Sequence, residues 1–145
     1  MSLYQPTAMK IAEYIVTQAY EDGDPVSNLK LQKLLYYVQG EAIKMHGEPA
    51  FKEPIEVWNY GPVVRTVYER FRIFGAGPIF RKYDTSGIIG DIKNVIDSVL
   101  AEYGNLSAWD LVQETHKPET PWSIAMENGK STISVTSMQE FFCKR

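Results

Sequence analysis

One long helical pattern, between Ser27 and Gly47, constrains the fold of this chain more than any other feature. Ser27 offers a side-chain oxygen to the unpaired amides at the start of a helix, and Gly47 suits the left-handed backbone that ends one. The apolar residues between them recur every three or four positions, which predicts one buried helical face: Leu31, Leu34, Leu35, Val38, Ala42 and Met45. We expect this to be the central helix of the fold.

Similar spacing, or matching cap residues, predicts six further helices. They cover residues 7–20, 62–74, 88–103, 107–116, 121–126 and 136 to near the end of the chain. Pro62 and Pro121 fall at first-turn positions, where a missing amide hydrogen costs nothing. The predicted N-caps are Thr7, Ser107 with Asp110 in a capping box, Thr120, and Thr136.

The predicted strands are few and short. Residues 55–58 are rich in strand-favouring side chains and follow Pro54, which predicts an edge strand. Residues 59–62 have the composition of a turn, residues 79–83 are the candidate partner strand, and residues 132–135 alternate as a strand does. The expected fold is mainly α with a small β element (α+β), as a single compact helical domain, residues 1–145, with a short antiparallel hairpin.

Composition agrees with an ordinary globular domain. The chain has 145 residues, of which 44% are apolar and 23% charged, enough to bury a core without staples. Cys143 is the single cysteine, so no internal disulfide can form, and a reducing compartment is expected. No secretory signal or membrane-spanning run is visible. We expect a cytoplasmic protein without a membrane partner.

Sequence patterns of catalytic and metal sites are missing. His46 and His116 are seventy residues apart and neither has metal-ligand spacing, while Cys143 lies beside the C-terminal Lys144. No nucleophile elbow, phosphate-binding loop or dinucleotide fingerprint occurs. We expect a protein that is not an enzyme and that holds no metal or cofactor. A hydrolase would require one of the histidines to meet a carboxylate or hydroxyl in a pocket.

A basic segment leaves one alternative function open. The net charge is −3, yet five of the fifteen basic residues fall within eighteen positions. They are Arg65, Arg70, Arg72, Arg81 and Lys82. Such a cluster is typical either of a solvated helix face or of a polyanion site, and a nucleic-acid-binding regulator that uses segment 65–82 is the alternative function. The Gly-Pro turn that follows leaves no room for a nearby recognition helix, which makes nucleic acid the weaker hypothesis.

Large amphipathic side chains gather in the middle of the chain. Five tyrosine and tryptophan residues fall within 33 positions: Tyr36, Tyr37, Trp58, Tyr60 and Tyr68. Tyrosine and tryptophan also fill cores with a polar tip that reaches a partner, so each of them taken alone fits the core equally well. As a group they indicate a surface that binds another protein.

The same region resembles a known family. Residues 31–40, LQKLLYYVQG, are similar to the signature helix of the Panacea family, whose members are SocA-like, phage-associated proteins. Residues 53–64, EPIEVWNYGPVV, followed by Val67 and Tyr68, resemble that family's strand, Tyr-Gly-Pro-Val turn and next helix. A third block, from Leu106 through His116 to Trp122, resembles its C-terminal pattern. The likeness covers nearly the whole chain.

This resemblance implies an antitoxin that neutralises a cognate protein toxin by direct contact. In the SocA-like branch it also implies an adaptor that delivers the toxin to an ATP-dependent protease. Because the apolar stripe assigns Leu31, Leu34 and Val38 to the core, partner binding is expected from residues beside the stripe and around the turn. The predicted partner-binding residues are Gln32, Lys33, Tyr36, Trp58, Tyr60 and Arg65.

Overall fold

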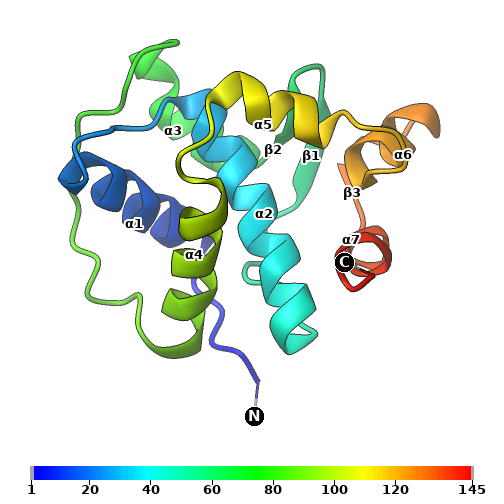
Figure 1. Cartoon of the computed structure of the whole chain (residues 1–145), viewed down its shortest axis with the longest axis horizontal. Helices are drawn as coiled ribbons and strands as arrows, with labels where there is room; N and C mark the ends of the chain where they lie inside the picture. The colour runs from blue at the N-terminus through cyan, green and yellow to red at the C-terminus, as the bar shows by residue number, and fades with distance from the viewer. Residues whose placement is uncertain (1, 145) are drawn as a thin grey trace.

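The computed structural model describes residues 2–144 and places helix α2 (Asn28–His46) at the centre of the molecule (Figure 1). The Ser27 side chain accepts a hydrogen bond from the amide of Lys30, and Gly47 ends the helix with a φ of +72°. Both predicted ends are therefore confirmed. The predicted single buried face is too narrow, because every residue from 30 to 40 is buried. Polar residues of α2 must therefore find partners inside the protein.

Five helices pack around α2 (Figure 1). Helices α1 (Ala8–Glu21) and α4 (Gly90–Tyr103) lie along one side of it, and α5 (Ala108–Thr115) crosses near its start. On the other side lies α7 (Val135–Phe142), preceded in the chain by α6 (Pro121–Glu127). The fifth is α3 (Arg65–Phe71), which is followed by the 3₁₀ turn η1 (Arg72–Phe74). No helix within residues 2–144 is long and apolar enough to cross a membrane.

Three short strands form an antiparallel sheet with the order β2-β1-β3. β1 (Ile55–Trp58) lies between β2 (Gly61–Val63) and β3 (Thr132–Ile133). In the register, Trp58 pairs with Gly61 and Ile55 with Ile133. The mainly helical fold with a small β element is thus confirmed, and the predicted strand 132–135 is present in part.

The expected partner strand at residues 79–83 is wrong. The two residues Asn59 and Tyr60 suffice to turn the chain, so β1 pairs with the segment that follows at once. Closing so short a loop costs less entropy than closing one of twenty residues. Pro62 fits there because β2 is an edge strand. Residues 78–79 instead contact the chain just before α2, where Ile79 donates its amide to the carbonyl of Val26.

Three predicted helix starts move. Helix α4 begins at Gly90, two residues after its predicted start. Helix α3 begins at Arg65 because Pro62 belongs to β2. Helix α7 is capped by Ser134, which lies two residues before the predicted cap Thr136. The hydroxyl of Ser134 accepts a hydrogen bond from the amide of Ser137. The confirmed caps are Thr7, the Ser107–Asp110 capping box, and Thr120 followed by Pro121.

Two residues near the middle of α2 attach neighbouring segments to it. The Oε1 atom of Gln39 accepts hydrogen bonds from the amides of Ala50 and Phe51, at 2.8 and 3.2 Å, and its Nε2 donates to the carbonyl of Phe51. Gly40 leaves space for α7, because a Cβ atom there would lie 2.5 Å from the ring of Phe142. The side chain of Gln39 and the small size of Gly40 therefore both stabilise the packing of neighbouring segments on α2.

Candidate partner-binding groove

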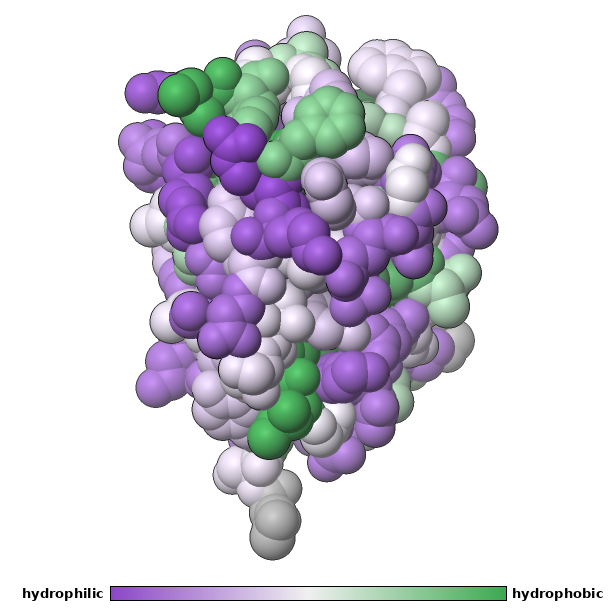
Figure 2. All heavy atoms as spheres, turned by 90° about the vertical axis from the view of Figure 1, so that its left-hand side faces the viewer, coloured by the Kyte–Doolittle hydropathy of each residue, from purple (hydrophilic) through white to green (hydrophobic). Residues whose placement is uncertain are grey.

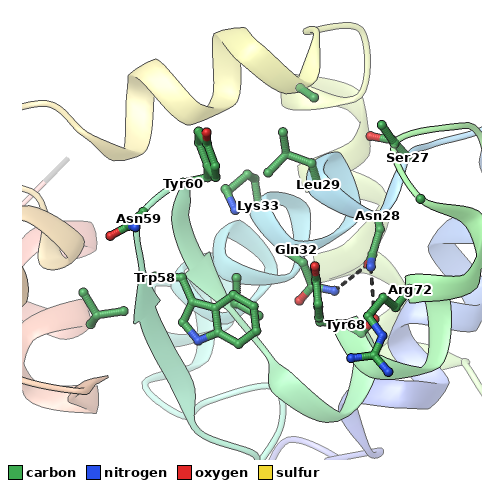
Figure 3. Close-up of a pocket in the computed structure, with 15 residues that line it drawn as sticks. Ser27, Asn28, Leu29, Gln32, Lys33, Trp58, Asn59, Tyr60, Tyr68 and Arg72 are labelled. Carbon is green, nitrogen blue, oxygen red and sulfur yellow. Dashed lines mark hydrogen bonds between the residues drawn. The ribbon is translucent and has the colours of Figure 1, made fainter.

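A groove of about 720 Å³ opens between the first half of α2, the β1–β2 hairpin and the end of α3 (Figure 3). We call it the α2–hairpin groove. Its volume lies within the range of ligand pockets. The side chains that decide its character are Leu29, Lys33, Trp58, Tyr60, Tyr68 and Arg72. Leu29 and Tyr60 lie on the α5 side of the groove in Figure 3, and Trp58 and Tyr68 lie on the opposite side.

The indole of Trp58 is held in place from three directions. Its Nε1 donates a hydrogen bond to Glu56 at 3.0 Å, its ring meets the Tyr68 ring edge to face at 4.9 Å, and the guanidinium of Arg65 lies 5.2 Å from its centroid. Arg65 also binds both carboxylate oxygens of Glu56, and this contact lowers the pKa of Glu56 below its ordinary value. The aromatic wall of the groove is therefore rigid before any partner arrives.

In contrast to Trp58, Tyr60 is largely exposed. It lies in the hairpin turn at the rim of the groove, and 63% of its surface is exposed. An exposed tyrosine across a concave apolar surface from a fixed tryptophan is typical of a site that binds a protein or peptide.

Lys33 lies under the hairpin and is completely buried. Its Nζ atom donates a hydrogen bond to the carbonyl of Pro62 at 3.1 Å, and no carboxylate of residues 2–144 forms an ion pair with it. Burial lowers the pKa of Lys33 to about 7, because the charged form loses its hydration. The fold thus keeps a lysine with no compensating negative charge at the base of the groove.

This burial predicts a pH-dependent stability. The folded pKa of Lys33 lies below its unfolded value of about 10.4, so the unfolded chain binds more protons between these two values and the free energy of unfolding rises with pH in that window. We expect a rise of about 2 kcal/mol from pH 7 to pH 9 in the wild type, and no such contribution in Lys33→Met. Urea denaturation of both proteins measures it. Parallel pH curves for the two would contradict this assignment. His116, the neighbouring titratable group, does not interfere, because its pKa is lowered from 6.5 and it stays neutral in this range.

Gln32 also lies in the lining of the groove, but its hydrogen bonds are used within the chain. Its Oε1 accepts from the amide of Val64 at 2.9 Å, and its Nε2 donates to Asn28, whose own amide donates to the carbonyl of Tyr68 (Figure 3). Val64 is the N-cap of α3 and has no side-chain cap of its own. Gln32 therefore positions the start of α3 and, through it, the wall of the groove.

The structure brings together four of the six predicted partner-binding residues. Gln32, Lys33, Trp58 and Tyr60 line the α2–hairpin groove, while Arg65 lies outside it against Trp58. Tyr36 is buried elsewhere, with its ring against Phe142. The inference that Gln32, Lys33 and Tyr36 lie outside the core is wrong, because α2 is covered on all sides. Their contact with a partner stays a prediction.

Leu29, Arg72 and Ala108 are among the groove residues that were not predicted as site residues. Ala108 comes from α5, and nothing in the local sequence places that helix beside the hairpin. Arg72 could have been identified from the sequence, because it belongs to the basic segment 65–82. Most of that segment is neutralised by ion pairs within the chain: Arg65–Glu56, Arg70–Glu13 and Lys82–Glu21. The guanidinium of Arg81 lies over the ring of Phe74.

The face that carries α1 and the loop between η1 and α4 is mostly hydrophilic, with apolar patches near its top and in its lower part (Figure 2). After η1 the chain runs without a helix until Gly90, so no recognition helix follows α3 closely. This arrangement gives no support to a helix-turn-helix.

The two histidines lie at helix ends, as expected. His46 ends α2, and His116 follows α5 and stacks on the indole of Trp122 at 3.9 Å. The pKa of His116 is lowered, first by burial and then by the positive charge of Lys33. Neither histidine forms an ion pair with a carboxylate within residues 2–144. The same residues contain no group of three or more His, Cys, Asp or Glu that could hold a metal ion.

Comparison with known proteins identifies the family. The family model described as antitoxin SocA-like, Panacea domain, matches residues 31–123, which include most of α2, the hairpin and most of the groove lining. The antitoxin SocA of Caulobacter vibrioides (strain NA1000 / CB15N) is 31% identical over 137 residues, covering 86% of this chain and 72% of the relative. No solved structure matches the chain. The chain therefore belongs to the SocA-like antitoxin family, which is defined by the Panacea domain.

Proposed function

We propose that this protein is an antitoxin that neutralises a cognate protein toxin by binding it through the α2–hairpin groove, without catalysis. The observation that carries the proposal is that exposed Tyr60 and the immobilised Trp58 line the same concave surface from opposite sides. A few aromatic anchors commonly supply most of the free energy of a protein interface. The region matched by the family model contains both residues.

Replacing Tyr60 by alanine tests the proposal with little risk to the fold, because the side chain is largely exposed. The probe is the purified product of the reading frame adjacent to the gene, tested as the candidate toxin. We expect its affinity to fall about 30-fold, as the loss of an anchor worth about 2 kcal/mol requires. Titration calorimetry measures the affinity, and growth rescue on co-expression measures neutralisation.

Tyr4→Ala is the matched control, since Tyr4 is also exposed, to 60%, and lines a different surface depression with Pro6 and Asp84. It should bind and rescue as the wild type does. Equal binding by the wild type, Tyr60→Ala, Trp58→Ala and Arg65→Ala, all folded, would show that the toxin uses another surface.

Two mechanisms of neutralisation must be distinguished. A blocking antitoxin inhibits the toxin by occupancy alone, whereas an adaptor also delivers it to an ATP-dependent protease. We propose blocking through the groove as the common step, with delivery as an additional one. Delivery predicts that the purified chain shortens the lifetime of the toxin in a reaction with the protease and ATP. An unchanged lifetime would remove the adaptor role and leave blocking intact.

A further inference from the structure

The α2–hairpin groove is cationic although the whole chain is acidic. Lys33 lies at its base and Arg72 at its edge, while none of the described residues that line it is an aspartate or glutamate. The net charge of the chain is −3. The ionisable lining residues Lys33 and Arg72 are therefore both basic, and electrostatic complementarity at Arg72 favours an anionic partner there.

Arg72 is the accessible cation of the groove. It is exposed, and within residues 2–144 it forms no ion pair, unlike Arg65, Arg70 and Lys82 of the same basic segment. Lys33 is too deeply buried to reach a large ligand directly, and its pKa of about 7 leaves it only partly charged at neutral pH, so Arg72 is the main cation of the groove. An incoming carboxylate would meet Arg72 first, in the bidentate geometry that a guanidinium offers.

The rest of the lining suits an apolar side chain. Leu29, Val57, Ala76 and Ala108 contribute aliphatic surface, and the rings of Trp58 and Tyr68 form one wall. The amides of Asn28 and Gln32 are already engaged with each other and with the backbone of α3. Recognition must therefore combine apolar contact with a charge contact at Arg72. Few polar groups of the groove remain available for hydrogen bonds to a partner.

We propose that the groove takes an acidic segment of the toxin, in which an apolar or aromatic side chain enters beside Trp58 and Tyr60 and a neighbouring carboxylate pairs with Arg72. This inference rests on the proposed function and adds the chemistry of the partner. A single-stranded nucleic acid also combines aromatic bases with negatively charged phosphates. Protein is favoured because binding along a phosphate backbone needs several unpaired cations, and Arg65, Arg70 and Lys82 are occupied by glutamates.

Charge reversal on the intact proteins is the first test. Arg72→Glu should weaken binding of the toxin at least tenfold, because it places a carboxylate opposite the proposed carboxylate. Arg81→Glu is the matched control, since Arg81 is exposed, lies on the same segment and does not line the groove. It changes the net charge equally and should alter the affinity less than twofold. A toxin with one acidic residue changed to lysine should regain binding to Arg72→Glu.

Small probes test the groove without the toxin. The tripeptide acetyl-Phe-Asp-Leu-amide should shift the NMR signal of the Trp58 indole N–H, with an affinity at least threefold higher than its Asn counterpart. Arg72→Glu should remove that preference. A hexamer of thymidine serves as the nucleic-acid probe and should bind more weakly than the Asp peptide.

The outcomes separate the two proposals. Selective loss in Arg72→Glu together with a preference for the Asp peptide supports the inference. If the wild type binds the toxin but the two charge reversals behave alike, or if the Asn peptide or the oligonucleotide binds as well as the Asp peptide, the inference is overturned and the proposed function stands. If the wild type does not bind the toxin at all, the proposed function fails, and a preference for the Asp peptide would still support an acidic ligand for the groove.

Discussion

Replacing Gly61 by alanine is expected to lower the free energy of unfolding by about 3 kcal/mol and to weaken toxin binding. Gly61 has a φ of +116°, a conformation that residues with a Cβ rarely adopt. A Cβ atom there would also lie 2.7 Å from Cε of Lys33 and 3.0 Å from the hydroxyl of Thr115. Lys33 is buried and bonded to the carbonyl of Pro62, so it has little room to move away. The hairpin that carries Trp58 and Tyr60 would be displaced.

Gly23→Ala is the control for the backbone component of this effect. Gly23 also has a positive φ, +77°, but nothing lies within 4 Å of a Cβ placed there. Its substitution should cost about 1 kcal/mol and leave toxin binding unchanged. Urea denaturation measures both variants. Equal losses for Gly61→Ala and Gly23→Ala would contradict the close packing of the hairpin on Lys33.

Replacing Gln39 by leucine is the second change with a large expected effect, again about 3 kcal/mol or more of unfolding free energy. The substitution keeps a similar volume but removes three hydrogen bonds to Ala50 and Phe51, which are 0% and 1% exposed. Two buried amides and one carbonyl lose their partner, and each buried polar group left unpaired costs about 1–3 kcal/mol.

Gln113→Leu is the matched helix control for Gln39→Leu. Gln113 is exposed on α5, so the same chemical change should alter the free energy of unfolding by less than about 0.5 kcal/mol. Denaturation curves for both variants, with the toxin affinity measured at a temperature where each is folded, separate stability from binding. A similarly small effect at both positions would contradict the anchoring role of Gln39.

The sequence predicts most of the helices because their ends carry local chemical signals. Ser27, Thr7 and Thr120 are followed by helical spacing, and each caps its helix in the structure. The capping box of Ser107 and Asp110 is likewise a local feature. Such signals act within four residues, so they can be identified without knowing the tertiary fold.

The parts that the sequence does not predict depend on contacts between distant segments. Burial of Gln32 and Lys33 follows from the hairpin folding over α2, about thirty residues later in the chain. An apolar stripe identifies the residues that must be buried, but it does not show that polar neighbours are buried as well when each finds an acceptor or donor. For the same reason the groove itself, with Ala108 contributed by α5, has no local pattern.

The buried polar residues of α2 and the residues around the groove therefore have different functions. Gln32, Lys33, Gln39 and Gly40 hold the hairpin, the 50–51 segment and α7 against α2. The surface for a partner is built on that frame by Trp58, Tyr60 and Arg72. Among family members that bind different toxins, we then expect sequence differences at the groove rim, where substitution leaves the buried residues intact.

Amide hydrogen exchange of the protein, alone and in complex with its toxin, tests the central claim most directly. Binding in the α2–hairpin groove predicts slower exchange in peptides that cover residues 57–63 and 68–76, which line it from two sides. Peptides from α7, which does not line the groove, should exchange at the same rate in both states. Unchanged exchange in the groove peptides, with protection at α6 and α7 instead, would contradict the account.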